Sequence, residues 1–287
     1  MPTPDIFVSS GGHRCTPTEA VRKLRDSGVQ DIELSAGLFQ EEGFNGLTDQ
    51  LSDGRLQVHN YFPPPPEPFV FNLCDPDDVG RERSIRFACA AIEFGKSLNS
   101  HVYSFHAGFL GTPAVSDLGR TWGVTNRVGF EEGSELFTDS VERVNHFARE
   151  RDVRLLVENN VFTVGTAASN GVDVLLMASP AGIRSAMERL PGDIGLLVDV
   201  AHLAVSARTL GFDASSCLRD LAPFIGAYHL SDNDGLSDSN EPVRENSWFW
   251  DHLDPTVAYV TLEVSPEKVG SYAEQIALIE RKLANRG

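Results

Sequence analysis

The sequence is poor in cysteine, and its few cysteines follow no recognisable spacing. Cys15, Cys74, Cys89 and Cys217 are scattered, and no two of them form a Cys-x-x-Cys pair. Buried free thiols in a reducing compartment explain this distribution better than disulfides do. Residues 1–5 lack the basic and apolar regions of a signal peptide. We therefore expect a cytoplasmic protein.

Long hydrophobic runs and basic tracts are also missing. No stretch approaches the ~20 apolar residues that a membrane span needs. Acidic residues outnumber basic ones 41 to 24, which gives a formal net charge of −17. Proteins that bind nucleic acid gain affinity by neutralising phosphates with Lys and Arg. The composition therefore predicts no membrane and no nucleic-acid partner, and an acidic surface that favours solubility.

The sequence does contain a regular alternation of strand and helix patterns. Eight runs are rich in apolar or β-branched residues, and most are nearly continuous, as expected for parallel strands buried on both faces. The runs are Ile6–Ser10, Asp31–Ala36, Leu56–Phe62, His101–His106, Arg154–Asn159, Ile194–Val200, Ile225–Leu230 and Ala258–Val264.

Helical patterns with recognisable starts lie between these runs. Thr16–Glu19 has the form of a capping box with a first-turn proline, Asp75-Pro76 is expected to open a long helix, and Ser265-Pro266 to cap the last one. Alternating strands and helices predict βα units with right-handed crossovers. Eight such units in 287 residues, slightly above the ~250 of a typical barrel, predict an α/β fold with one (β/α)8 TIM barrel domain over residues 1–287.

Six successive strand patterns end in a residue type that binds metals. These residues are His59, His106, Glu158, Asp199, His229 and Glu263, and His202 follows Asp199 by three positions. The carboxyl ends of barrel strands meet at one mouth, so we expect these side chains to lie close together.

Three carboxylates and an imidazole suit a hard or borderline divalent ion such as Mn²⁺, Mg²⁺, Co²⁺ or Zn²⁺. Without a cation, burial of Glu158, Asp199 and Glu263 together would force protonation or strong repulsion. The alternative is a hydrogen-bonded polar plug in the barrel.

Four motifs carry a family resemblance. Val157–Asn159, Val198–His202, Tyr228–Asp232 and Thr261–Glu263 resemble the Glu, Asp-x-x-His, His-x-x-Asp and Glu motifs of the xylose-isomerase-like superfamily. Within it, the pattern is most similar to the ketose 3-epimerase and sugar-phosphate isomerase/epimerase branches. The resemblance implies that one divalent ion is held by Glu158, Asp199, His229 and Glu263, and that His202 touches substrate or supports the ligands.

The resemblance also implies a chemistry. A sugar or sugar derivative would be isomerised or epimerised by proton abstraction next to a metal-bound carbonyl, through an enediolate. Glu158 and Glu263, on opposite sides of the substrate, are the expected proton carriers. We expect His59 and His106 to bind sugar hydroxyls or shuttle protons.

Two segments after the seventh strand bear on the substrate. Related epimerases often carry an arginine after the seventh-strand histidine, whereas Ser231–Gly235 contains no basic residue. This favours a polyhydroxylated or amino-bearing substrate, with Asp232 as a binding residue, although the segment is equally typical of a turn. Trp248 in Trp248–Trp250 is a candidate for stacking on a sugar ring; a subunit contact, compatible with a homodimer, and core packing are the alternatives.

Two inserted segments, Pro63–Pro66 and Gly111–Gly133, are expected on the active-site face because both follow strand ends.

Three rival functions share the pattern of metal-binding residues at the strand ends. A lyase resembling inosose dehydratase would use the same enolate chemistry. A phosphodiesterase resembling the type-IV apurinic endonucleases would use several zinc ions, but the Asp-x-His that completes such a cluster is lacking, since Asp251 and His252 are adjacent. A sugar-binding barrel without catalysis is the third.

Overall fold

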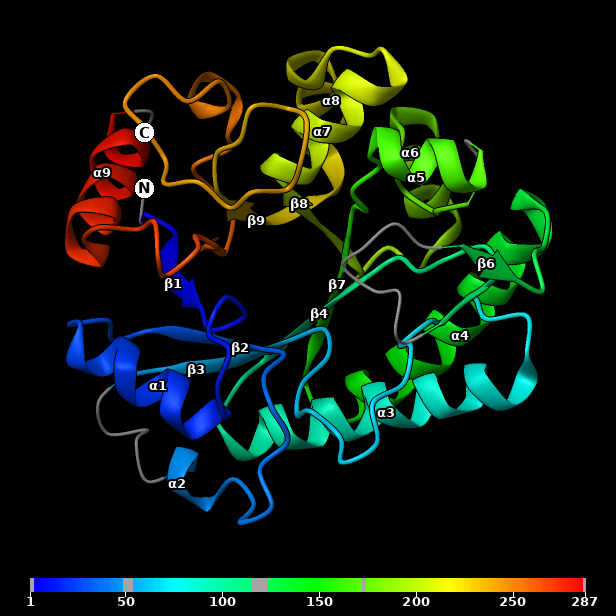
Figure 1. The fold of residues 1–287 in the computed structure, drawn as a ribbon, viewed down its shortest axis with the longest axis horizontal. Helices are drawn as coiled ribbons and strands as arrows, with labels where there is room; N and C mark the ends of the chain where they lie inside the picture. The colour runs from blue at the N-terminus through cyan, green and yellow to red at the C-terminus, as the bar shows by residue number, and fades with distance from the viewer. Residues whose placement is uncertain (1–2, 49–53, 115–122, 172–173, 286–287) are drawn as a thin grey trace.

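The computed structural model describes residues 3–48, 54–114, 123–171 and 174–285. Eight parallel strands close into a barrel with helices around it, as predicted (Figure 1). The strands are β1 (Asp5–Ser9), β2 (Ile32–Ser35), β3 (Leu56–His59), β4 (Val102–His106), β7 (Arg154–Glu158), β8 (Gly195–Asp199), β9 (Ile225–Leu230) and β10 (Tyr259–Leu262). β1 pairs with β10 and thereby closes the barrel.

The helices of the described residues follow the strands around the outside of the barrel. They are α1 (Pro17–Asp26), α2 (Asn45–Thr48), α3 (Asp78–Ser97), α4 (Phe130–Arg149), α5 (Val164–Asn170), α6 (Pro180–Arg189), α7 (Val200–Leu210), α8 (Ala214–Leu221) and α9 (Tyr272–Ala284). None of these helices is both long and apolar enough to cross a membrane.

Two of the three predicted helix starts were wrong. The backbone N–H of Thr16 donates to Glu19 at 3.2 Å, so the box before α1 is confirmed. α3, however, is capped by Asp77, while Asp75 accepts from the hydroxyl of Thr112 at 2.9 Å. α9 is capped by Ser271. Ser265 belongs to a separate turn, in which its carbonyl accepts from the backbone N–H groups of Lys268 and Val269.

The barrel interior changes from apolar to polar along its axis. Alternate residues of each strand point inward, and Phe7, Leu156, Leu197, Ala227 and Tyr259 form an apolar layer. The next inward residues along these strands are polar and lie toward the strand ends. The intervening residues pack outward against the helices, so the strands are buried on both faces. The polar layer is where the candidate site lies.

Both inserted segments have structure of their own. After the tetraproline run, Phe69 and Phe71 pack with Tyr61 around Phe87 of α3, with ring centroids 5.1–5.4 Å from that of Phe87. The 111–133 segment is more than a loop, because β5 (Thr112–Pro113) pairs with β6 (Val124–Thr125) and α4 begins within it. Residues 115–122 lie outside the described residues.

Candidate active site

The four expected metal ligands come together at the mouth of the barrel. One ligand atom from each of Glu158, Asp199, His229 and Glu263 lies within 4.8 Å of the others. Three of them end or nearly end β7, β8 and β9, and Glu263 directly follows β10. Asp199 and His229 are backbone partners in the β8–β9 ladder, which fixes their side chains on the same interior layer.

Hydrogen bonds tie these strand ends together. The side-chain oxygen of Asn159 accepts from the backbone N–H of Asp199 at 2.9 Å, and its amide donates to the Asp199 carbonyl at 3.2 Å. The carboxylate of Asp199 caps α7 by accepting from the backbone N–H of His202 at 2.8 Å. Asn159 thus holds β7 against β8, and this contact fixes the spacing between Glu158 and Asp199.

Glu158 is the most unusual group in the site. Its side chain is fully buried, and neither carboxylate oxygen has a hydrogen-bond partner among the described residues. Imidazole nitrogens of His59, His106, His202 and His229 lie 3.2–3.5 Å from these oxygens. A buried carboxylate without hydrogen bonds is costly unless a cation compensates it. This environment fits a divalent ion.

The electrostatics show how strongly the site attracts positive charge. Burial alone would raise the pKa of Glu158, but the imidazoles of His106, His229 and His59 hold it well below its usual range. Burial likewise raises the pKa of Glu263. The nearby His229 has the larger, opposite effect, and the pKa of Glu263 falls to about 2. Despite burial, Glu33, Glu158 and Glu263 hold the pKa of His229 well above its usual value. A metal ion at this ring would displace a proton.

His202 lies between Asp199 and a residue that the sequence did not single out. Its Nδ1 donates to the carbonyl of Asn159 at 3.1 Å, and its Nε2 donates to Asp238 at 3.2 Å. Burial lowers the pKa of His202, but Asp199 and Asp238 raise it well above its usual value. Burial also raises the pKa of Asp199 to about 7. Asp238 belongs to a loop rich in Asp and Ser, and nothing in the sequence distinguishes it from the other acidic residues of that loop.

His59 and His106 complete a second group around Glu158. Ligand atoms of these three residues also lie within 4.8 Å of one another, so Glu158 belongs to two candidate metal-ligand groups. Nδ1 of His59 is 2.9 Å from the hydroxyl of Ser104. Burial lowers the pKa of His106 to about 4, so this ring is neutral near pH 7.

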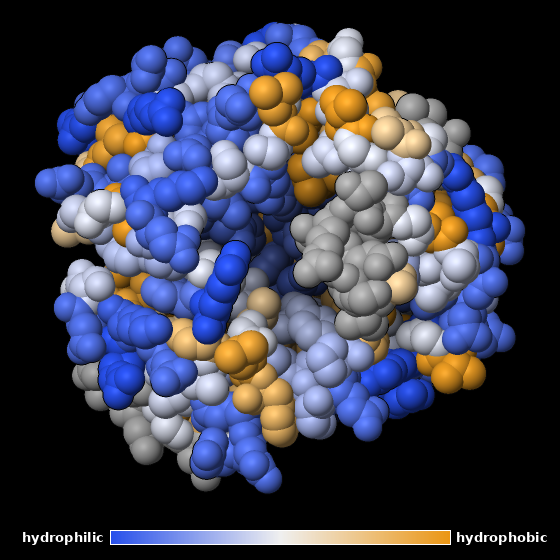
Figure 2. Space-filling view, in the orientation of Figure 1, coloured by the Kyte–Doolittle hydropathy of each residue, from blue (hydrophilic) through white to orange (hydrophobic). Residues whose placement is uncertain are grey.

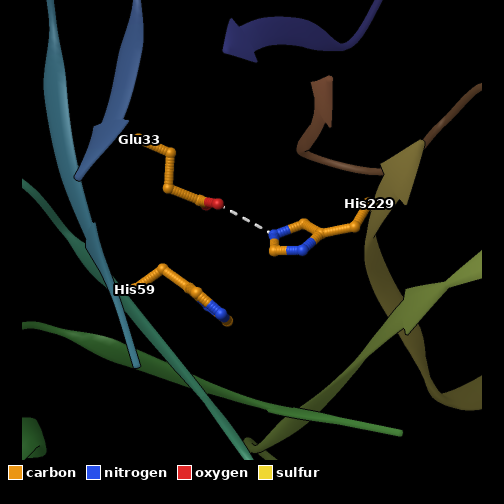
Figure 3. A group of neighbouring side chains, drawn as sticks. All are labelled: Glu33, His59 and His229. Atoms are coloured by element: carbon orange, nitrogen blue, oxygen red, sulfur yellow. Dashed lines mark ion pairs between the residues drawn. The ribbon is translucent and has the colours of Figure 1, made fainter. Parts of the chain in front are cut away.

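The sequence did not single out Glu33 either. It forms a third candidate metal-ligand group with His59 and His229. It lies in the middle of β2, fully buried, with Oε1 2.9 Å from Nε2 of His229 (Figure 3). The available signal was a single charged residue between the apolar Ile32 and Leu34.

Asp232 and Trp248 have other contacts. Asp232 accepts from the hydroxyl of Ser247 at 2.7 Å and forms a backbone bridge with Glu241 within the β9–β10 connection. Trp248 is partly buried and packs edge-on against the fully buried Phe249. These contacts agree with the turn and core-packing alternatives, and neither residue lines the cavity described next. Their substrate-binding roles stay predictions.

A cavity of about 610 Å³ opens beside the site. Figure 2 shows the molecule in the orientation of Figure 1, with a hollow near the centre of the view. At one end the cavity is lined by His106, His202 and Asp238, and elsewhere by aromatic side chains that include Phe69 and Phe109. No Lys or Arg is among the described residues that line it. The cavity therefore offers polar groups next to the carboxylates and apolar surface farther away.

A family model described as the xylose isomerase-like TIM barrel matches residues 21–260. The chain belongs to the xylose isomerase-like TIM barrel family. Its resemblance to that family, inferred from the four motifs, is confirmed. No curated protein matches this chain.

Solved structures share the whole fold with this family member. A D-tagatose 3-epimerase-like protein has 15% identity and a TM-score of 0.73, over 98% of this chain and 97% of that one. An L-ribulose 3-epimerase has 14% identity and a TM-score of 0.66, over 99% and 92%. A protein from Thermus thermophilus, soaked with zinc chloride, has 22% identity and a TM-score of 0.64, over 99% of both chains. At these identities the likeness shows the fold.

Proposed function

We propose that this protein is a divalent-metal-dependent isomerase or epimerase of a sugar or sugar derivative. The observation that carries the proposal is the buried carboxylate of Glu158, which lacks hydrogen-bond partners among the described residues and lies beside Asp199, His229 and Glu263. These four residues would hold one Mn²⁺, Co²⁺, Mg²⁺ or Zn²⁺ ion. The similar structures of a D-tagatose 3-epimerase-like protein and an L-ribulose 3-epimerase support the same reaction class.

The bound ion would polarise the substrate carbonyl and so acidify the adjacent C–H bond. The side chain of Glu263 is 23% exposed, whereas that of Glu158 is fully buried. Glu263 is therefore the more accessible of the two carboxylates, and its lowered pKa keeps it ionised at neutral pH and able to accept the proton. Because β8 and β9 separate β7 from β10, Glu158 approaches from a different direction. Removal of the proton by Glu263, and delivery to the other side by Glu158 once a neighbouring imidazole has protonated it, would invert the carbon.

Residues that line the cavity would bind the substrate hydroxyls. His106 is neutral, so its ring can donate one hydrogen bond and accept another. His202 and Asp238 form a charged pair at the same end of the cavity. These groups complement polar hydroxyl or amino groups, and the described residues that line the cavity include no Lys or Arg to bind a phosphate. We therefore propose a substrate without phosphate, bound as a small molecule by a protein with no nucleic-acid partner.

Solvent deuterium uptake tests the proposal. We expect the metal-loaded protein in D2O to exchange hydrogen at a carbon beside the carbonyl of an unphosphorylated ketose or keto-sugar. Phosphorylated counterparts should react with a kcat/KM at least about tenfold lower, because no Lys or Arg among the described lining residues would balance the phosphate charge. NMR and mass spectrometry of the sugars measure the exchange. Exchange confined to sugar phosphates would contradict the substrate class, and a product lighter by one water would indicate a dehydratase.

A multi-zinc phosphodiesterase is the second candidate, favoured by the second group formed by His59, His106 and Glu158. The Asp251-His252 pair does not complete a larger cluster there, because it lies in the Trp250–His252 turn that packs against α8. Cleavage of abasic DNA by the zinc-loaded protein, without any sugar exchange, would favour this candidate over the first.

A further inference from the structure

We propose that Glu33 is a positioning residue that fixes the proton of His229 on Nε2 and thereby presents Nδ1 to the metal ion. The inference rests on the metal centre of the proposed function and concerns a residue outside its ligand set. It follows from the surroundings of one ring, because the two nitrogens of His229 face different partners.

Nδ1 faces the proposed ligands. It lies 2.8 Å from Oε2 of Glu263 and 3.5 Å from Oε1 of Glu158. Nε2 points the other way, toward Oε1 of Glu33 at 2.9 Å. Both Glu33 and His229 are fully buried, and neither Nε2 nor Oε1 has any other hydrogen-bond partner among the described residues. An imidazole that binds a metal through one nitrogen keeps its proton on the other, and that N–H needs an acceptor.

Glu33 is itself held in place from two other strands. Its Oε2 accepts from the side-chain amide of Gln57 on β3 at 2.7 Å and from the hydroxyl of Thr261 on β10 at 3.1 Å. With these two donors on Oε2, Oε1 is left to face His229. Figure 3 shows the carboxylate and the ring approaching each other across the barrel interior, with His59 beside them. β2 thus supports a ring on β9, a strand with which it does not pair.

The same geometry makes Glu33→Gln a sharp test. Gln57 and Thr261 both donate, so they favour the amide oxygen of the new side chain at the Oε2 position. Its NH2 group would then face Nε2 of His229 and favour a lone pair there. The ring proton would move to Nδ1, where it blocks the metal. The substitution changes the shape of residue 33 very little and reverses the hydrogen-bonding requirement at one nitrogen.

The matched control is Thr261→Val, which removes a donor to Oε2 of Glu33 and leaves Oε1 facing His229, the backbone partner of Thr261 in the β9–β10 ladder. We expect Glu33→Gln to raise the Kd for Zn²⁺ or Mn²⁺, measured by calorimetry on ion-free protein, by about 10- to 100-fold. Thr261→Val should change it less than about threefold. Thermal melts of the ion-free variants show whether each one folds.

A second measurement does not depend on any variant. In zinc-loaded, ¹⁵N-histidine-labelled protein, the His229 ring proton should be found on Nε2, and a proton on Nδ1 overturns the proposal. An unchanged Kd in Glu33→Gln also overturns it. So does a fall in stoichiometry from two ions to one, which would make Glu33 a ligand. Neither measurement uses a sugar, so both can support the positioning role of Glu33 even if the protein exchanges no sugar hydrogen. A wild-type protein that binds no ion overturns both the positioning role and the proposed function.

Discussion

Replacement of Glu263 by Gln is expected to lower the rate of carbon–hydrogen exchange by about 100- to 10,000-fold, the usual contribution of a positioned general base. The amide keeps an oxygen for the metal and has the same shape, but it cannot accept a proton. Glu263 is the partly exposed carboxylate of the four-residue group, so its loss should strike the chemical step. The measurement is the deuterium uptake rate at saturating substrate, with bound metal quantified in the same samples.

Two comparisons make this result interpretable. Glu267→Gln removes a nearby surface carboxylate that accepts from Ser265 at 2.9 Å, and it should leave the exchange rate unchanged. Glu158→Gln should also slow exchange, because the proton must return from the second carboxylate. Unchanged turnover in both Glu158→Gln and Glu263→Gln, with metal retained, would contradict the acid–base assignment.

Loading with a divalent ion should raise the midpoint of thermal unfolding by about 10 °C. An ion at 1,000 times its Kd stabilises the folded state by about 4 kcal/mol, and each 1 kcal/mol corresponds to roughly 2–4 °C in a chain of this size class. The physical source is the buried Glu158 carboxylate, which gains a counter-ion. Differential scanning fluorimetry with and without chelator measures the shift.

The chain offers a matched pair of variants for this experiment. Asp199 and Asp213 both cap helices, by accepting from the backbone N–H of His202 and Ser216 respectively, and Asn is an equally good cap residue. Asp199→Asn weakens a proposed ligand and should lose most of the metal-dependent shift. Asp213→Asn, at the start of α8, should keep it. Equal shifts in the two variants would place the ion elsewhere.

The strands could be predicted because parallel barrel strands are buried on both faces and read as apolar runs. The helix starts were harder, since Asp75-Pro76-Asp77 offers two cap residues and only the tertiary contact with Thr112 shows that Asp75 is engaged elsewhere. Ser265-Pro266 likewise has the local form of a cap, but it closes a turn six residues before Ser271. Local sequence could not rank these alternatives.

In the site, the residues at strand ends could be predicted and the others could not. A barrel brings strand ends together whatever the intervening chain does, so Glu158, Asp199 and His229 were expected to meet. Glu33 lies mid-strand, and its role depends on a partner across the barrel. Asp238 is one of several acidic residues in its loop, and only the folded chain brings it to His202.

A metal count tests most directly whether Glu158, Asp199, His229 and Glu263 hold one divalent ion. The protein would be purified without chelators or an affinity metal column, and its metals measured by plasma mass spectrometry. We expect about one Mn, Co, Mg or Zn ion per chain, lost in Asp199→Asn and retained in Asp213→Asn. No bound ion after incubation with each of these metals, or close to three zinc ions per chain, would contradict this expectation.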